Sequence, residues 1–323
     1  MNAPILSVRN LTVEYTTPAG AARAINDVSF DLAEGEFLAI VGESGCGKST
    51  LLFAIAQLLS YPAETVAGSV FFKGVDLVSL SAEDLRRHRW RDISVVMQSA
   101  MNAFNPILTI EAQLADACRA HTDWNGKKIA ARSAEVLGMV AIDAVHLKSY
   151  PFQLSGGMRQ RAMIAMALLL EPKLVIMDEP TSALDVVAQR SLMRQVQTLR
   201  HELGFAVLFV THDMSVVSHF SDRLAVMYAG EVVELGATRG VFDHPQHPYS
   251  QGLMDAFPSL VGDYRQLTGI PGAPPSLIAP PPGCHFADRC PCVFDECRVT
   301  KPDLIDKDGY EVRCHLVHRK ANS

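Results

Sequence analysis

The chain has 323 residues, 48% of them hydrophobic, and a formal net charge of −6 at pH 7. This length favours two folded domains with a large buried core, and the acidic balance disfavours a nucleic-acid partner, which usually needs a basic surface. The first residues show neither a basic segment nor a long apolar one, so we expect no signal peptide and a chain that stays in the cytosol. Apolar runs such as Ala162 to Leu170 are shorter than the roughly 18 residues that suggest a membrane span. Attachment to a membrane would therefore depend on a partner.

Short apolar runs alternate with helical patterns along most of the chain. Buried strands are predicted at Phe37 to Val41, Leu174 to Met177 and Ala206 to Val210, each followed by polar residues. Apolar residues recur at helical spacing from Val187 to Leu203 and stop at Gly204, which predicts a helix with a C-terminal glycine. The alternation predicts an α/β fold whose ligand lies at the carboxyl ends of the strands.

A glycine-rich segment follows the first of these strands and precedes a helix expected to begin near Lys48. It fits the pattern G-x-x-x-x-G-K-[ST] of a phosphate-binding loop in its proper context. Its residues are Gly42, Glu43, Ser44, Gly45, Cys46, Gly47, Lys48, Ser49 and Thr50. We expect the backbone N–H groups to surround the phosphates of ATP, Lys48 to reach the terminal phosphates and Ser49 to ligate Mg²⁺. The loop alone does not separate GTPases, kinases, helicases and transporters.

Two adjacent acids end the strand that begins at Leu174. Asp178 suits the coordination shell of Mg²⁺, and Glu179 suits polarising the attacking water. Phosphoryl transfer to water needs both tasks done, whereas an acidic pair that only starts a turn before Pro180 would do neither.

Further motifs follow in a fixed order with this pair. The segment Leu154 to Arg161, LSGGMRQR, resembles the signature sequence of ABC ATPases. Gln98 follows an apolar run, the segment Ser182 to Asp185 follows the acidic pair, and His212 follows a predicted strand. The resemblance to ATP-binding subunits of ABC transporters covers residues 5 to 235 without a gap. It implies a P-loop NTPase core of the ABC type with a helical subdomain.

The resemblance also implies a role for each matching residue. Tyr15 is expected to stack on adenine, Gln98 to sense Mg²⁺ and the γ-phosphate, Glu179 to act as general base, and His212 to hold the γ-phosphate and water. A glutamate beside phosphate can polarise water, and an imidazole can donate to developing negative charge. Asp185 is counted with the nucleotide-binding residues.

Signature residues Ser155, Gly156 and Gly157 are implied to close over ATP bound to the opposite subunit. Glycines allow close backbone approach, and the following helix presents its positive end. Met158 replaces the glutamine most common at its position, a change familiar in the peptide-importer branch. The segment Gln98 to Pro106 resembles the long Q-loop of that branch, and the helical subdomain is expected at about residues 100–165, where it would meet the membrane subunits.

Composition changes near residue 240. Eleven of the 18 prolines lie from Pro245 to Pro302. We therefore predict a nucleotide-binding domain at residues 1–240 and a small, irregular, cysteine-containing extension at 241–323. The segments His247 to Ser250 and Gly283 to Pro291 resemble the C-terminal extension of peptide and nickel importer ATPases.

Five of the seven cysteines lie between residues 284 and 314. In a cytosolic chain such a cluster indicates metal binding or chemistry before disulfides. Four match the pattern of that extension, and their residues are Cys284, Cys290, Cys297 and Cys314. Some members of the branch carry a [4Fe-4S] cluster there, and four thiolates suit one. Zinc is disfavoured because the sequence has no paired C-x₂-C knuckles. Reduced structural thiols are the other alternative. Cys292 has no assigned role.

Together these patterns predict an ATPase that powers import of di- or oligopeptides from the cytoplasmic face of the inner membrane. The expected partners are two membrane-spanning permease subunits, an extracytoplasmic substrate-binding protein and a second ATPase subunit, favoured to be a different chain. Nickel, glutathione or an oligosaccharide are alternative substrates, because the ATPase itself never touches the substrate. A non-transport ABC ATPase acting on nucleic acid or ribosomes, which normally has two such domains or a long insertion, is a remote alternative. A module that binds ATP without turnover is disfavoured by Glu179 and His212.

Overall fold

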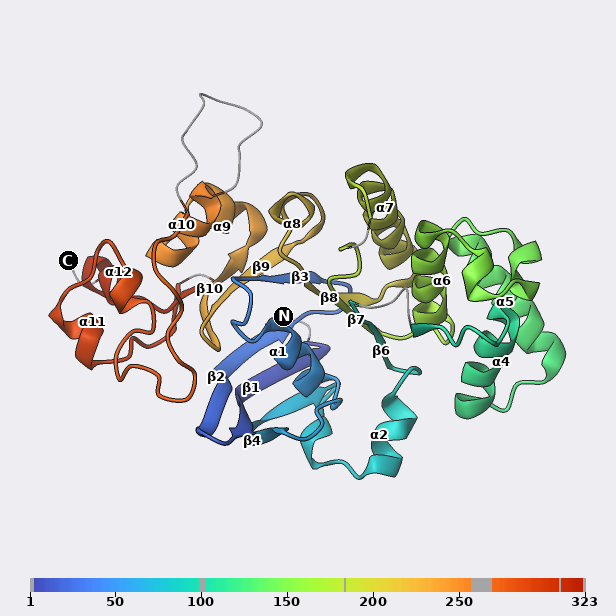
Figure 1. Ribbon diagram of the computed structural model, residues 1–323, viewed down its shortest axis with the longest axis horizontal. Helices are drawn as coiled ribbons and strands as arrows, with labels where there is room; N and C mark the ends of the chain where they lie inside the picture. The colour runs from blue at the N-terminus through green and yellow to red at the C-terminus, as the bar shows by residue number, and fades with distance from the viewer. Residues whose placement is uncertain (1–2, 99–102, 183, 257–268, 308, 322–323) are drawn as a thin grey trace. The chain divides into compact units, whose positions relative to one another are not determined.

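The computed structural model describes residues 3–98, 103–182, 184–256, 269–307 and 309–321. Its contacts define two compact units. Unit one contains Met1–Ile5, Leu32–Phe37 and Ser79–Phe209, and unit two contains Leu6–Asp31, Leu38–Val78 and Val210–Ser323. Strands and helices alternate in both, which confirms the predicted α/β class (Figure 1). In the part of the chain that the structure describes, no helix has both the length and the apolar character needed to cross a membrane.

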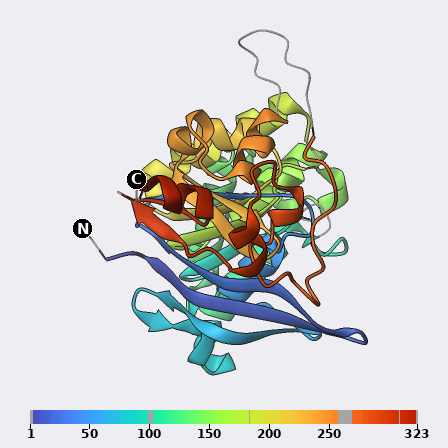
Figure 2. The same cartoon turned by 90° about the vertical axis from the view of Figure 1, so that its left-hand side faces the viewer.

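Unit two contains an antiparallel sheet and most of a second sheet. The first has the strand order β2-β1-β4-β5, with β1 antiparallel to β4, and Figure 2 shows the long strands β1 and β2 side by side. Within unit two the second has the order β11-β12-β10-β9-β3, in which β3 and β9 are parallel and the other pairs antiparallel. The strand bounds are β1 (Leu6–Thr17), β2 (Gly20–Leu32), β3 (Phe37–Val41), β4 (Ala63–Phe72), β5 (Val75–Asp76), β9 (Arg223–Tyr228), β10 (Glu231–Ala237), β11 (Ile305–Lys307) and β12 (Tyr310–Val312).

Helices of unit two are mostly short. Their bounds are α1 (Lys48–Ile55), α8 (Met214–Phe220), α9 (Thr238–Asp243), α10 (Pro248–Asp255), α11 (Asp295–Val299) and α12 (His315–Ala321). All five residues of β3 are buried, as expected of a short apolar strand inside a sheet. Helix α1 is the next element after β3. The glycine-rich segment between them therefore lies at the carboxyl end of a buried strand.

A buried carboxylate joins the last third of unit two to its sheet. Glu234 of β10 has no exposed surface, and it accepts hydrogen bonds from the backbone N–H groups of Gln246 (2.7 Å) and His247 (2.9 Å). The hydroxyl of Tyr310 donates to the same carboxylate. A buried charge is tolerated only with such partners, so the carboxylate fixes both β12 and the start of α10.

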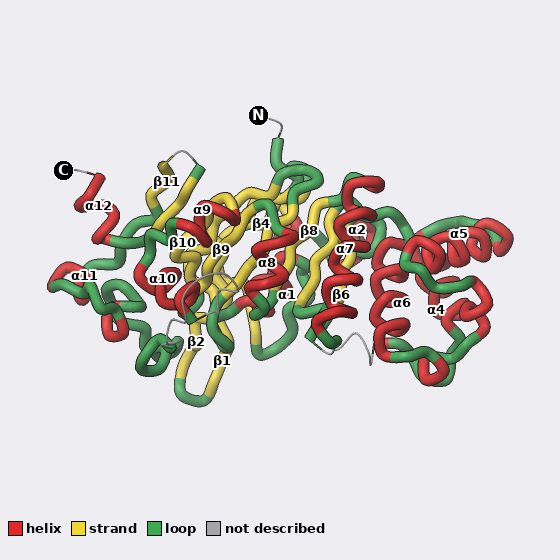
Figure 3. The backbone as a smooth tube through the Cα atoms, turned by 90° about the horizontal axis from the view of Figure 1, so that it is seen from above, coloured by secondary structure: helices red, strands yellow, loops and turns green. Residues whose placement is uncertain are grey.

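Unit one contains three strands in the order β8-β7-β6 and a group of helices. The bounds are α2 (Ala82–His88), β6 (Ile93–Val96), α4 (Ile110–His121), α5 (Gly126–Met139), α6 (Gly156–Leu168), β7 (Leu174–Asp178), α7 (Val186–Leu203) and β8 (Ala206–Val210). Helices α4, α5 and α6 lie side by side (Figure 3). The buried guanidinium of Arg132 in α5 donates to the carbonyl oxygens of Leu168 and Leu169 at the end of α6. This contact satisfies carbonyls that a helix end leaves free.

The strands and the long helix expected from the sequence are confirmed. Strands β3, β7 and β8 coincide with the three apolar runs, with β7 extending one residue further to Asp178. Helix α7 ends at Leu203, and Gly204 follows in the left-handed region at φ 69°. The short strands β11 and β12 were not expected. They extend the sheet beside β10 with residues that follow the proline-rich part of the chain.

Candidate nucleotide site and cysteine cavity

The phosphate loop is shaped by contacts that leave no room for side chains at two of its glycines. A Cβ on Gly42 would lie 2.2 Å from the carbonyl oxygen of Met227, and one on Gly47 would lie 2.4 Å from that of Ala24. Gly47 is also the N-cap of α1 at φ 105°, and no side chain caps the helix there. The first N–H groups of α1 are thus unused by a side-chain cap, which is the arrangement that binds phosphate.

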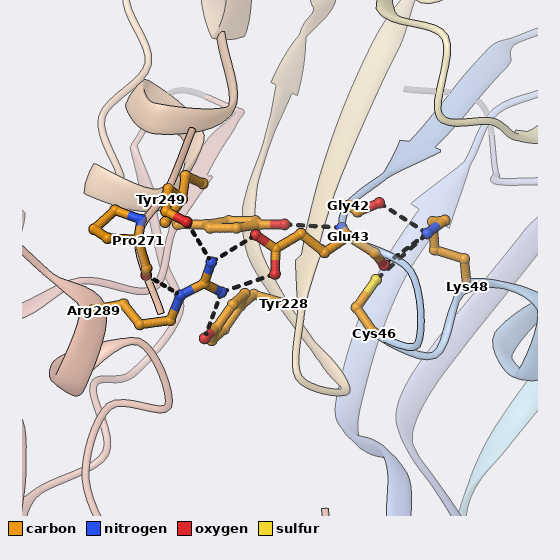
Figure 4. A network of polar contacts seen from close by, with 9 residues as sticks. Gly42, Glu43, Cys46, Lys48, Tyr228, Tyr249, Pro271 and Arg289 are labelled. Atoms are coloured by element: carbon orange, nitrogen blue, oxygen red, sulfur yellow. Dashed lines mark hydrogen bonds and ion pairs between the residues drawn. The ribbon is translucent and has the colours of Figure 1, made fainter. Parts of the chain in front are cut away.

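Lys48 lies over this loop. Its side chain is buried, and its Nζ donates to the carbonyl oxygens of Gly42 and Glu43, both at 2.9 Å (Figure 4). The Sγ of Cys46 lies 3.8 Å from the same nitrogen. Burial raises the pKa of the Cys46 thiol above its ordinary value of 9.0. The loop therefore offers an ammonium group and helix N–H groups in one place, both suited to phosphate.

Tyr15 of β1 lies against the first turn of α1. Its hydroxyl is 3.1 Å from Oγ1 of Thr50, and either atom can be the donor. The ring is partly exposed. The structure thus places Tyr15 beside the phosphate loop. His212, which belongs to the same unit, is exposed between β8 and α8.

Gln98 and the acidic pair meet in unit one. Nε2 of Gln98 donates to Oε2 of Glu179 at 2.8 Å, across 81 residues of sequence. Asp178 is 3% exposed at the end of β7. Glu179 adopts φ 44°, in the left-handed region that a residue with a side chain rarely occupies. Strain of this kind occurs most often at functional sites.

The signature residues begin α6. Ser155 is its N-cap, and its Oγ accepts from the N–H of Met158 at 3.2 Å. Apart from its chain neighbours and the backbone of its own helix, a Cβ added to Gly157 would meet no atom of the described residues within 4 Å. Asp185 is likewise the N-cap of α7 and accepts from the N–H of Ala188 at 2.8 Å. Ser155 and Asp185 therefore have capping roles within the chain. Ala183, part of the segment before α7, and residues 99–102 of the Q-loop lie outside the described residues.

Two functional contacts of the phosphate loop were missed from the sequence. Arg289 makes an ion pair with Glu43, and the hydroxyl of Tyr249 accepts from the N–H of Glu43. The sequence contained both residues in segments that resemble the importer extension. No local pattern, however, indicated that either would reach a loop more than 200 residues earlier.

The five C-terminal cysteines line one cavity. Its walls also include His247, Phe286, Phe294 and His315. Burial raises the pKa of Cys284 to about 12 and that of Cys290 to about 11. Across the described ranges, which include all seven cysteines, no group of three or more His, Cys, Asp or Glu side chains could hold a metal ion. The cavity thus gathers the four cysteines predicted to bind a cluster, but they do not form a ready metal site in the described residues.

Comparison with known proteins identifies two regions of the chain. Residues 25–182 match the family described as ABC transporter, and residues 233–297 match the oligopeptide/dipeptide transporter C-terminal region. The dipeptide transport ATP-binding protein DppD of Bacillus subtilis is 45% identical over 98% of this chain and 96% of its own length. The oligopeptide transport ATP-binding protein OppD of Haemophilus influenzae is 42% identical over 99% of both chains.

Solved structures agree with this assignment. The ATP-binding cassette MJ0796 in a dimeric post-hydrolysis state, bound to ADP and Pi, has a TM-score of 0.65 and 31% identity. The match covers 73% of this chain and 99% of that cassette. The full-length similarity and the phosphate-loop geometry show that the chain binds and hydrolyses ATP and belongs to the ABC transporter ATP-binding proteins, in their oligopeptide/dipeptide branch.

Proposed function

We propose that the chain supplies the energy for import of di- or oligopeptides. The observation that carries this proposal is the presence, in one chain, of the ABC core and the oligopeptide/dipeptide C-terminal region. Relatives named for dipeptide and oligopeptide transport match over nearly the whole length. In this proposal the chain lies at the cytoplasmic face of the inner membrane, bound to two permease subunits that receive substrate from an extracytoplasmic binding protein.

Uptake measurements test the substrate class. Purification of the tagged chain identifies its membrane subunits. Uptake of a labelled dipeptide, a labelled hexapeptide and ⁶³Ni²⁺ is then compared between wild-type cells and cells that carry Lys48→Ala. We expect peptide uptake to be lost with the variant. Loss of nickel uptake with unchanged peptide uptake would overturn the peptide assignment and leave the ATPase assignment intact.

We infer the roles of the site residues in ATP hydrolysis from the family to which the chain belongs. In unit two, the loop N–H groups and Lys48 hold the phosphates, Ser49 ligates Mg²⁺, and Tyr15 and His212 contact adenine and the γ-phosphate. In unit one, Asp178 and Gln98 would serve as Mg²⁺ ligands and Glu179 would polarise water. The Gln98 to Glu179 hydrogen bond and the strained backbone of Glu179 support this second part. Mg²⁺ would neutralise charge on the transferred phosphoryl group.

Replacing the proposed base tests this assignment. Glu179→Gln keeps the hydrogen-bond size of the side chain but removes its basicity, so turnover should fall by roughly 10²–10⁴-fold with MgATP affinity retained. Glu171→Gln, on an exposed residue of the same unit, is the matched control and should hydrolyse ATP normally. Wild-type turnover in Glu179→Gln would show that another group acts as base.

We also propose that a second ATPase subunit, favoured to be a different chain, completes each site. The open space at Gly157 supports this, because no contact among the described residues leaves a Cβ without room there. Ser155, Gly156, Gly157 and Asp185 would then contact the nucleotide of the partner. The purified chain alone should bind ATP and hydrolyse it slowly, with turnover rising when membrane subunits and the second ATPase are added. Two copies of this chain and no other ATPase in the purified transporter would exclude the heterodimer.

The extension at residues 241–323 is proposed as a separate functional part after the nucleotide-binding domain at 1–240, with its helical subdomain at about 100–165. We propose the cysteine cavity as the site of a [4Fe-4S] cluster because Cys284, Cys290, Cys297 and Cys314 all line it. Such a cluster would supply a cross-link for a segment with little apolar core. Anaerobic purification followed by iron and sulfide analysis tests this. Iron-free protein that hydrolyses ATP at the full rate would reject it.

A further inference from the structure

One side chain of the C-terminal extension contacts the phosphate loop by two parallel hydrogen bonds. Nη1 and Nη2 of Arg289 donate to Oε2 and Oε1 of Glu43 at 2.8 and 2.9 Å (Figure 4). The Arg289 side chain is 6% exposed and that of Glu43 is 26% exposed. A paired arrangement of this kind is stronger and more directional than a single hydrogen bond. Glu43 is the second residue of the phosphate loop.

Every N–H group of Arg289 has an acceptor. Nε donates to the carbonyl oxygen of Pro271 at 2.8 Å. Nη1 also donates to the hydroxyl of Tyr228, and Nη2 to the carbonyl oxygen of Ile270, both at 3.2 Å. A guanidinium that is satisfied in all five directions is held in one orientation. The carboxylate of Glu43 is therefore fixed by a rigid group, unlike the carboxylate of an exposed ion pair.

The backbone of Glu43 is held from the same side. Its N–H donates to the hydroxyl of Tyr249 at 2.9 Å, and Tyr249 is fully buried. The Tyr249 ring packs against Tyr228 and Phe286, with centroids 4.6 and 5.4 Å away. Phe286 in turn lines the cysteine cavity. An aromatic cluster thus supports both contacts that the extension makes with the loop.

The position of Glu43 matters because the loop binds a polyanion. Its carbonyl oxygen accepts from Nζ of Lys48, and Figure 4 shows Glu43 between Arg289 on one side and Lys48 on the other. A carboxylate free to rotate here would repel the phosphates of ATP and attract the ammonium of Lys48. Both effects would weaken ATP binding.

We propose that Arg289 is a positioning residue for ATP binding. It neutralises the Glu43 carboxylate and holds it on the side of the loop opposite Lys48, so that the N–H groups and ammonium of the loop meet the phosphates without a competing negative charge. The inference goes beyond the proposed function, because it concerns ATP affinity and holds for any transported substrate.

A mutant cycle on the purified full-length chain tests the proposal, with MgATP affinity measured by calorimetry. Arg289→Ala leaves Glu43 unpaired and should weaken MgATP binding about tenfold, the effect of losing one charged hydrogen-bonded contact. Glu43→Gln removes the carboxylate and supplies the reference MgATP affinity for the double variant. The double variant should bind MgATP like Glu43→Gln alone, because the group that Arg289 neutralises is gone. Arg298→Ala is the matched control, since Arg298 pairs with Asp288 in the same extension but is 54% exposed.

The MgATP affinity of the double variant separates a positioning role of Arg289 from a merely structural one. A structural clamp would leave the double variant as weak as Arg289→Ala, and this result would overturn the proposal. Wild-type affinity in Arg289→Ala would overturn it equally. If Arg289→Ala does not fold, the same cycle is run with Arg289→Lys, which keeps the charge but loses the paired geometry. Weakened binding that Glu43→Gln relieves is then expected, and absence of relief would contradict the proposal.

Discussion

The phosphate loop and the signature segment are both glycine-rich turns that begin a helix, but their glycines differ in the room left for a side chain. At Gly42 and Gly47 a Cβ would collide with backbone carbonyl oxygens at 2.2 and 2.4 Å, and Gly47 has φ 105°. At Gly157 the backbone is helical, and outside its own helix and chain neighbours a Cβ would meet no described atom within 4 Å. The first segment thus needs glycine for its own fold. The second shows no such need in its contacts with the described residues.

The largest expected effect is that of Gly47→Ala. Left-handed backbone costs a residue with a Cβ about 1–2 kcal/mol, and overpacking about 1–3 kcal/mol more. Because this free-energy cost falls on the phosphate loop, it should lower MgATP affinity by roughly a hundredfold and also lower the melting temperature. Calorimetry and thermal unfolding measure the two. Wild-type MgATP affinity in this variant would contradict the claim that the phosphate loop needs glycine at position 47.

Gly157→Ala should behave in the opposite way. Alanine is favoured over glycine inside a helix by about 0.5–1 kcal/mol, so the melting temperature should stay the same or rise slightly. MgATP binding by the isolated chain should not change. Turnover of the assembled transporter should fall at least about tenfold, because an added methyl group would displace a closely approaching nucleotide. A drop in melting temperature like that of Gly47→Ala would show that the two glycines are alike after all.

Ser155 allows the capping and nucleotide roles to be separated. Ser155→Ala removes the N-cap of α6 and should cost about 1 kcal/mol of stability. Ser155→Asp keeps a good cap and should restore that stability, while its negative charge near a partner's phosphates should keep transporter turnover low. Full turnover with Ser155→Asp would mean that the residue is only a cap.

The smallest effect concerns Cys46 of the phosphate loop. A raised pKa lowers the thiolate fraction at any given pH, and the thiolate is the reactive form. Alkylation by iodoacetamide between pH 7 and 9 should therefore modify the exposed Cys292 early and Cys46 late, as followed by peptide mass spectrometry. Equal rates would indicate that the loop is packed less tightly than its glycine contacts require.

Local patterns were sufficient for much of the fold. The strands β3, β7 and β8 are short, wholly apolar runs, and the phosphate loop has fixed spacing, so each could be predicted without knowing what it contacts. The hydrogen bond between Gln98 and Glu179 joins two residues to which the resemblance gives different roles in ATP hydrolysis. The resemblance placed these residues in one site before any geometry was known.

Contacts of the extension could not be predicted in this way. Strands β11 and β12 have three residues each, too few for a periodic pattern, and their pairing with β10 is set by tertiary packing. Arg289 stands beside Cys290, one of the predicted cluster ligands, and nothing in that pattern indicates a partner for the arginine. Its partner Glu43 is fixed by the path of an irregular segment, which no local propensity encodes.

The buried carboxylate of Glu234 has a practical consequence for anyone who wants the ATPase core as a shorter recombinant product. A stop codon after residue 240 would delete Gln246, His247 and Tyr310, leaving a charge inside the protein with none of these three donors. It would also expose the edge of β10, which favours strand pairing between molecules and aggregation into inclusion bodies. Expression trials should therefore retain the sequence through β12.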